Sequence, residues 1–290
     1  MASPGISSDG DTAPADAPSA DAVMGRASGE NFPVALRILP RTLRTRLLSI
    51  YGFARLVDQL GDDVAGDRGA ALDALEADVD RIYRGEAPRH DAIAPLPATI
   101  RSRGIPRGPF DRLIAANRQD QDVARYETWE ELDAYCDLSA NPVGELVLYV
   151  LGSATPERIA LSDRVCTALQ LAEHWQDVRE DRVLRDRVYL PAVELRRFGV
   201  SEDELRADSA SAELRALMEA AVARARGLLD EGRPLVGTLT GWGRVAVAGY
   251  VGGGYATLDA IEAAGYDPLP GPPKATPRAM LWAAWKVRRG

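Results

Sequence analysis

The chain has 290 residues, a formal net charge of −8 and a hydrophobic content of 46%. Its length permits one large core, and its acidic balance argues against a nucleic-acid partner, because such a protein needs a clustered basic surface to neutralise phosphates. The two cysteines, Cys136 and Cys166, are too few for a disulfide framework or a zinc site. We therefore expect a cytoplasmic protein that binds a small molecule or a lipid.

Residues 1–29 are rich in Ala, Pro, Ser, Gly and Asp and lack the regions of a signal peptide, so they are predicted to be a disordered tail. Beyond them, Ala, Leu, Arg and Glu recur at helical spacing and strand-like alternation is scarce, which predicts an all-α fold. No apolar run approaches the roughly 18 residues of a membrane-spanning helix. Helices are predicted at about 42–61, 70–84, 110–122, 129–138, 143–152, 156–182, 201–232 and 243–264.

Composition divides the chain after the tail into two parts. Residues 30–270 are expected to form one helical domain, and residues 271–290 a Pro/Gly-rich linker followed by a basic amphipathic segment. Within that segment, residues 278–289 mix apolar side chains with a basic cluster. This pattern suits peripheral contact with a membrane surface, and it equally suits docking onto the domain.

Two pairs of aspartates with the spacing Asp-x-x-x-Asp lie on separate predicted helices. On each helix the polar residues share one face, beside an apolar stripe that is expected to pack inward. The first polar face consists of Tyr51, Arg55, Asp58 and Asp62. The second consists of Gln170, Glu173, Asp177 and Asp181. The matching spacing predicts that the two faces meet in the interior of a helical bundle.

One such pair alone is typical of a solvated helix face, where the repulsion costs only about 0.2–0.5 kcal/mol. Two facing pairs differ, because buried unit charges about 4 Å apart repel by roughly 4 kcal/mol at an effective dielectric constant of about 20. Ligands that are all oxygen select a hard cation such as Mg²⁺, which usually bridges a few carboxylates to phosphate oxygens. The sequence therefore predicts a magnesium site for a diphosphate.

Three further residues are candidates for binding that diphosphate. Arg55 lies one turn before Asp58 and would either bind phosphate oxygens or pair with the neighbouring aspartates, and both alternatives stay open. Arg187 and Tyr189 follow the second acidic cluster closely, just before Pro191. Both are candidate phosphate donors, although each taken alone is better explained as a surface or packing residue.

At these residues the chain resembles the squalene/phytoene synthase family, over most of residues 30–267. The motifs that carry the resemblance are Tyr51–Asp62, Leu169–Asp181 with Arg187–Pro191, and Leu258–Asp267. The resemblance implies a single large helical bundle of the isoprenoid synthase type around a central cavity. It also implies that the two aspartate motifs bind Mg²⁺ and the diphosphate of a prenyl diphosphate substrate from facing walls.

Three features resemble one subgroup of this family, the hydroxysqualene synthases of the hopanoid pathway. They are Glu30–Val34, the Trp175-Gln176-Asp177 run, and Tyr135-Cys136 with Ser139–Gly144. This subgroup implies conversion of presqualene diphosphate and water to hydroxysqualene and diphosphate. It also implies companion enzymes of the squalene pathway as partners, and work in the cytoplasm or at the inner face of the membrane.

The resemblance assigns roles residue by residue. The implied metal ligands are Asp58, Asp62, Glu173, Asp177 and Asp181. The implied catalytic residues are Tyr51, Arg55 and Gln170. The implied substrate-binding residues are Asn31, Arg55, Arg187 and Tyr189.

The chain departs from the family pattern at three points. Glu173 stands where Asn is usual, Asp58-Gln59 stands where adjacent acids are usual, and the segment from Asp181 to Arg187 is one residue longer. The glycine cluster Gly252–Gly254 lacks the spacing and preceding strand of a nucleotide site, so we interpret it as close helix packing. The lack of a nucleotide motif favours capture of water over NADPH-dependent reduction.

Two other functions remain alternatives. The first is head-to-head condensation of farnesyl or geranylgeranyl diphosphate to presqualene diphosphate, squalene or phytoene. The second is a non-catalytic family member that acts as an assembly scaffold. Intact aspartates in both motifs argue against a scaffold, because it has no need for the repulsion that they create.

Overall fold

The computed structural model describes residues 18–19, 39–64 and 66–289. The predicted tail at residues 1–29 lies outside these ranges apart from residues 18–19, and the candidate substrate-binding residue Asn31 lies outside them as well. All the structural statements below concern the described residues.

Every regular element in the described part of the chain is a helix, which confirms the all-α class, and an isolated parallel β-bridge joins Arg125 to Val188. The first elements are α3 (Arg41–Asp62), α4 (Arg68–Tyr83), η2 (Asp91–Ile93), α5 (Leu96–Arg103), α6 (Gly108–Gln119), α7 (Trp129–Ser139) and α8 (Asn141–Leu151). The later elements are α9 (Pro156–Gln176), α10 (Val178–Glu180), η3 (Asp181–Arg185), α11 (Ala192–Phe198), η4 (Glu202–Arg206), α12 (Ala212–Gly232), α13 (Leu235–Thr238), α14 (Gly241–Ala263) and α15 (Pro277–Arg289).

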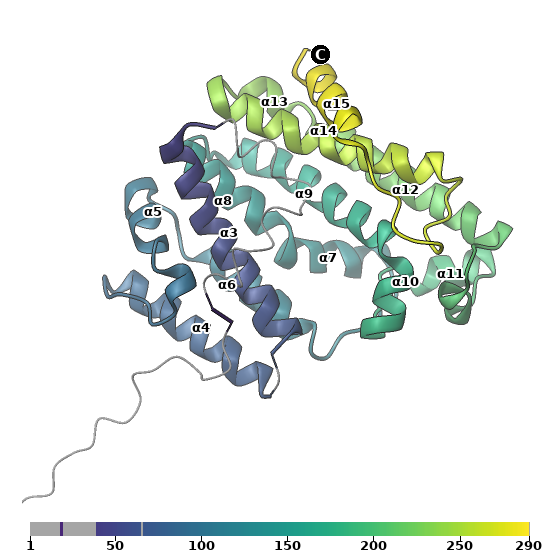
Figure 1. Ribbon diagram of the computed structural model, residues 1–290, viewed down its shortest axis with the longest axis horizontal. Helices are drawn as coiled ribbons and strands as arrows, with labels where there is room; N and C mark the ends of the chain where they lie inside the picture. The colour runs from purple at the N-terminus through teal and green to yellow at the C-terminus, as the bar shows by residue number, and fades with distance from the viewer. Residues whose placement is uncertain (1–17, 20–38, 65, 290) are drawn as a thin grey trace, which may run out of the picture.

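The buried apolar side chains form two clusters. One joins α3 to α6 and contains Phe53 and Phe110, which meet edge to face with ring centroids 4.8 Å apart. The other joins α7, α9, α12 and α14 around Trp175, whose indole N–H donates to the Ala221 carbonyl at 3.2 Å. Figure 1 shows α3 to α6 on one side of the molecule and α12 to α15 on the other, with α8 and α9 between them.

Helix α8 connects the two clusters because it is apolar on opposite faces. Leu146 and Val150, four residues apart, belong to the cluster of α3, whereas Leu148 belongs to the cluster of α9. Both α3 and α9, which carry the predicted acidic faces, pack against α8. Helix α8 therefore sets the distance between the two acidic helices.

The predicted helix at 156–182 is wrong in its last part. Helix α9 ends at Gln176, where Asp177 adopts φ −103° and ψ 14°, and the chain continues as the short α10 and the π turn η3. A π turn bonds residue i to i+5, so it holds one residue more than an α turn. This turn accommodates the longer segment between Asp181 and Arg187.

The predicted helix at 201–232 begins later than expected. Helix α12 starts at Ala212, because Ser211 is extended and its side chain caps the helix by accepting the Leu214 N–H at 3.1 Å. The residues before it form the 3-10 turn η4, and helix α11, which was not predicted, follows Pro191. These short elements surround the end of the π turn.

Helix α15 docks on α14 by means of a glycine. A Cβ at Gly252 would lie 2.3 Å from the Ala284 nitrogen, and one at Gly254 would lie 2.7 Å from Leu169 Cδ2, which confirms the packing interpretation of the cluster. Val287 is buried, so one face of α15 is seated on the domain. Within the described ranges, no helix combines the length and apolar character that crossing a membrane requires.

Candidate active site

The last turns of α3 bring the first acid pair close to α6. Gly61 permits this approach, because a Cβ there would lie 2.3 Å from Asn117 Oδ1. The Asn117 amide donates to the Leu113 carbonyl at 3.2 Å and lies 3.5 Å from Asp58 Oδ1. Solvent reaches the Asp58 carboxylate, yet the surrounding protein desolvates it and raises its pKa to about 7, while Arg55 and Asn117 oppose that rise.

Arg187 links this α3 face to the segment that follows the second acid pair. Its Nη2 lies 3.0 Å from Asp62 Oδ1 and 3.1 Å from the Asp120 carbonyl oxygen, and the residue is only 9% exposed. The substrate-binding candidate Arg187 is thus in direct contact with a predicted metal ligand. It already has acidic and carbonyl partners.

Asp120, just after α6, is a site residue that the sequence analysis missed. The Tyr135 hydroxyl donates to its Oδ2 at 2.9 Å, whereas its Oδ1 is buried without a hydrogen-bond partner. Burial raises its pKa to about 6, with Arg187 opposing and Asp62 adding to the rise. No motif marks Asp120, because its neighbours come from distant parts of the chain.

The second acid pair lies where α9 gives way to the π turn. Burial raises the pKa of Asp181 to about 7, although Arg185, 3.4 Å away, opposes the rise. Burial and the charge of Glu180 also raise the pKa of Asp177. A positive charge placed nearby would favour the charged forms of both aspartates.

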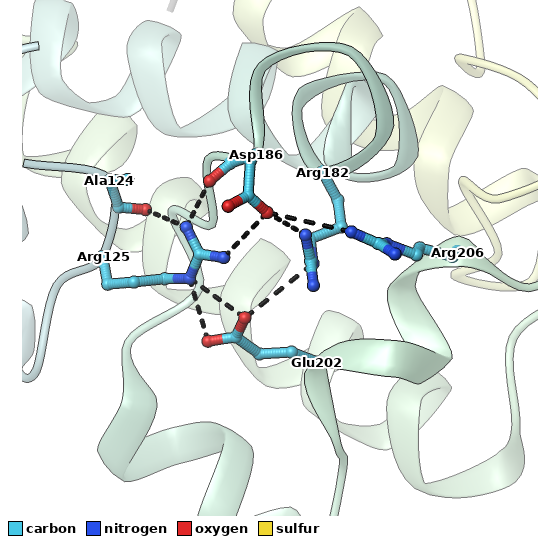
Figure 2. Close-up of polar contacts among 6 residues, drawn as sticks. All are labelled: Ala124, Arg125, Arg182, Asp186, Glu202 and Arg206. Carbon is cyan, nitrogen blue, oxygen red and sulfur yellow. Dashed lines mark hydrogen bonds and ion pairs between the residues drawn. The ribbon is translucent and has the colours of Figure 1, made fainter. Parts of the chain in front are cut away.

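A cluster of charged side chains holds the end of the π turn, as Figure 2 shows. Its centre is Asp186, which has a left-handed φ of 53°. The Asp186 carboxylate lies 3.1 Å from Arg125 Nη2 and also pairs with Arg182, and Arg125 also donates to the Asp186 carbonyl. Glu202 binds Arg125 Nε at 3.0 Å. The cluster thereby holds the backbone next to Arg187.

Tyr189 lies in a buried stack of rings. Its ring stacks on His174 with centroids 3.6 Å apart, and the Tyr135 ring lies at 5.8 Å. Burial, assisted by Arg187, lowers the pKa of His174 to about 3, so this imidazole is neutral at pH 7. The catalytic candidate Gln170 places its Nε2 3.2 Å from His174 Nε2. The stack forms an uncharged wall behind the acidic residues.

The two remaining candidates on α3 are Arg55 and Tyr51. Arg55 acts on the Asp58 carboxyl through its charge, and its buried Nε has no hydrogen-bond partner within the described ranges. A buried N–H without an acceptor costs about 1–3 kcal/mol, so this position favours the phosphate-binding alternative. Tyr51 lies one turn earlier on the same face and is half-buried.

A small, mostly apolar cleft opens between α9 and α14. Leu169 and Tyr250 contribute to its walls, and Gly253 leaves room because it has no side chain. The metal-ligand candidate Glu173 is a polar wall residue of this cleft. The cleft thus places apolar side chains next to one acidic group.

The structure brings some predicted site residues together and keeps others apart. Asp62 and Arg187 are in contact, and Asp181, Arg187, His174 and Tyr189 line one small pocket. Across the described residues, no three carboxylate, imidazole or thiol groups converge closely enough to hold a metal ion by themselves. The five predicted ligands are thus distributed over α3, the end of α9 and the π turn, and within the described residues they do not form one cage.

The all-α fold, with one acid pair on α3, the other where α9 gives way to the π turn, and the buried Arg187 between these segments, is of the isoprenoid synthase type. The chain belongs to the squalene/phytoene synthase family, whose model matches residues 26–282.

Individual relatives within the family carry different activities. The hydroxysqualene synthase of Rhodopseudomonas palustris is 36% identical over 209 residues, which are 71% of this chain and 70% of that protein. The presqualene diphosphate synthase of the same organism is 32% identical over 211 residues, 72% of this chain and 75% of that protein. Among solved structures, squalene synthase HpnC from Alicyclobacillus acidocaldarius is 45% identical with a TM-score of 0.78, and the match covers 83% of this chain and 91% of that one.

Proposed function

We propose that this protein converts presqualene diphosphate and water to hydroxysqualene and diphosphate with the help of Mg²⁺. The observation that carries the proposal is the presence of two acid pairs beside two arginines. One is Arg55, whose buried Nε has no hydrogen-bond partner among the described residues, and the other is Arg187, which binds Asp62 and follows the second acid pair in the chain. The similarity to a hydroxysqualene synthase supports this choice of reaction.

The carboxylates fit Mg²⁺. The residues that would hold it are Asp58, Asp62, Glu173, Asp177 and Asp181. Their oxygen ligands are of the kind that Mg²⁺ prefers, since this ion usually binds one or two carboxylates together with water and substrate phosphates. When bound, Mg²⁺ would supply positive charge that stabilises the departing diphosphate.

The side chains of the chain bind and orient the substrate. Arg55 would donate from its buried Nε to a diphosphate oxygen. Arg187 would release the Asp62 carboxylate and bind a second diphosphate oxygen instead. Tyr51 and Gln170 would position the diphosphate or the attacking water. Tyr189 is 7% exposed and stacked on a ring, so we assign it to the wall of the site and not to phosphate binding.

The reaction breaks the bond between carbon and the diphosphate oxygen, and the electron pair leaves with the diphosphate. The cyclopropylcarbinyl cation rearranges in the apolar cleft and is captured by one water molecule. The water oxygen forms the new bond to carbon, and its extra proton leaves to solvent. The lining of this cleft includes Tyr250, and aromatic side chains attract cations.

The alternative reaction is head-to-head condensation of prenyl diphosphates, which the similarity to a presqualene diphosphate synthase favours. Incubation with presqualene, farnesyl and geranylgeranyl diphosphates, each with Mg²⁺, separates the two reactions when the products are identified by chromatography and mass spectrometry. We expect hydroxysqualene from presqualene diphosphate, with ¹⁸O incorporated from labelled water. Turnover of farnesyl or geranylgeranyl diphosphate alone would overturn the proposal.

Two variants test whether the acid pairs are required. Asp58→Asn and Asp177→Asn should each lower kcat by about 10²–10³-fold, and chelation with EDTA should abolish turnover until Mg²⁺ is restored. Asp259→Asn is the matched control, because Asp259 is exposed and pairs with Arg226 on the surface. Unchanged product in cells that express either site variant would favour the scaffold alternative.

We also propose that the protein acts in the cytoplasm, at the inner face of the membrane, beside companion enzymes of the squalene pathway. Its substrate and product are lipids with long hydrocarbon chains, and transfer of such molecules through water is slow and costly. Co-purification of tagged protein with those enzymes from a gently lysed native host tests the partnership.

A further inference from the structure

Helix α15 presents an apolar face that the domain does not cover. Leu281, Trp282 and Trp285 are 58%, 55% and 45% exposed, and the two indoles stack with ring centroids 5.0 Å apart. The opposite face is seated on α14, where Val287 is buried and Gly252 permits close contact. The exposed residues are therefore not needed to hold α15 on the domain.

The charge of the chain changes sign before this helix. The chain carries a net charge of −8, yet it contains no acidic residue after Asp267. Both lysines of the chain lie in this last stretch. Its basic residues are Lys274, Arg278, Lys286, Arg288 and Arg289.

Basic groups border the exposed aromatic face directly. Lys286 Nζ lies over the Trp282 ring at 5.0 Å from its centroid, and the Arg289 guanidinium lies over the Trp285 ring at 4.1 Å. Cationic groups and indoles thus share one side of α15, which lies at the edge of the molecule in Figure 1. Tryptophan prefers the headgroup level of a bilayer, and basic residues there meet lipid phosphates.

From this juxtaposition we propose that α15 binds the surface of a lipid bilayer that carries anionic headgroups. The helix lies in the plane of the membrane, with Trp282 and Trp285 at headgroup level and the basic residues on the phosphates. The start of α14 lies beside the end of α15, because Arg244 donates to the Arg288 carbonyl at 2.7 Å. Trp242, in the first turn of α14, is 46% exposed. This proposal does not depend on which prenyl diphosphate the enzyme uses.

A second copy of the chain fits this face less well than a bilayer does. The acidic surface of a second copy would attract the basic residues of α15, but the apolar face of α15 also needs an apolar surface to cover it. In the described ranges, the other large exposed apolar side chains are scattered over four elements: Tyr83, Val183, Leu184, Val193 and Trp242.

Flotation of the full-length protein with vesicles of phosphatidylcholine, with and without phosphatidylglycerol, tests the proposal. We expect the wild type to float with the anionic vesicles and about tenfold less with the neutral ones, and high salt to reverse the binding. Trp282→Ala/Trp285→Ala should lower binding to anionic vesicles at least about tenfold, because burial of the indoles supplies the apolar part of the affinity. Equal flotation of this variant and the wild type would contradict the proposal.

Two double variants test whether the basic residues of α15, and not the net charge of the whole protein, drive vesicle binding. Arg288→Gln/Arg289→Gln should lower binding by about fivefold per residue. Arg196→Gln/Arg197→Gln makes the same charge change at an exposed pair on α11 and should leave binding unchanged. If the tryptophan variant loses thermal stability, this arginine comparison decides the question. The proposal would be overturned if the two arginine double variants lowered vesicle binding equally. It would also be overturned if the protein were a dimer in the absence of lipid and the tryptophan variant were a monomer.

Discussion

The Arg187 guanidinium lies 3.0 Å from the Asp62 carboxylate, although 125 positions separate the two residues in the chain. This ion pair connects the end of α3, which belongs to one core cluster, with the segment after the second acid pair, which belongs to the other. One side chain therefore joins the two acidic halves of the site.

Replacement of Arg187 by Ala should lower both stability and turnover. The residue is 9% exposed, and its loss leaves the Asp120 carbonyl and the Asp62 carboxylate without their donor. We expect a loss of about 2 kcal/mol in the free energy of unfolding and a kcat lower by about 10²-fold, measured by urea unfolding and steady-state kinetics. Arg187→Lys keeps the charge and should recover stability more than turnover, because it cannot reproduce the planar fork.

A matched control for this prediction is Arg226→Ala. Arg226 also binds two partners, Asp259 and Glu262, but it does so at the surface, where ion pairs are worth about 0–1 kcal/mol. The Arg226→Ala variant should leave kcat unchanged. Wild-type kcat in Arg187→Ala would remove this residue from the substrate-binding set.

Gly252→Ala should loosen α15 from the domain. The added Cβ would lie 2.3 Å from the Ala284 nitrogen, so the backbone must move, at a cost of about 1–3 kcal/mol. Gly253→Ala is the neighbouring control, because its Cβ meets nothing within 4 Å and Ala favours a helix by about 0.5–1 kcal/mol. Thermal unfolding and limited trypsin cleavage after Lys286 measure the two effects, and equal melting temperatures would argue against close packing at Gly252.

Gly253→Leu should obstruct the cleft between α9 and α14. The leucine side chain would enter space that is bounded by Leu169 and Tyr250, so we expect kcat/KM to fall by about tenfold or more with little change in stability. Gly227→Leu on α12 provides the control, since it also meets open space but lies outside the cleft. Steady-state kinetics on both variants measures the difference. If Gly253→Leu retained full activity, the substrate would have to bind elsewhere.

Asp163→Asn should stabilise the protein above pH 6. Asp163 Oδ1 is buried without a hydrogen-bond partner, and burial, with Asp137 and Glu145 adding to it, raises the Asp163 pKa to about 6. A raised carboxyl pKa means that ionisation favours the unfolded state, so the cost grows as pH rises from the unfolded value of about 4 to the folded value and is constant above it. Because solvent screens part of this cost, we expect a gain of about 1 kcal/mol at pH 7.5.

Urea unfolding at pH 7.5 and at pH 4.5 measures this gain. It should shrink at the lower pH, where the carboxyl is largely protonated in the folded protein. Asp208→Asn removes the same charge from a side chain that is 97% exposed and should change stability by less than about 0.5 kcal/mol. A gain that did not vary with pH would point to packing instead of charge.

Local signals in the sequence were sufficient to predict the all-α class and most of the long helices, because helical periodicity and spacing depend on residues within a few turns of one another. These local signals failed where the end of a helix depends on contacts with distant parts of the chain. Nothing around Asp177 marks the end of α9, and the left-handed Asp186 depends on Arg125, from the loop between α6 and α7, and on Arg182, from the π turn itself.

The sequence by itself determined which residues carry the acidic faces, because four polar positions at helical spacing on each of two segments have little other use, and it supported membership of the family. Only the tertiary structure decided which contacts link the α3 face to the segment after the second acid pair. The contact of Arg187 with Asp62, the place of Asp120 beside them and the approach of Ala284 to Gly252 each join residues that are far apart in the chain. Such contacts arise from the packing of whole helices, which no local pattern encodes.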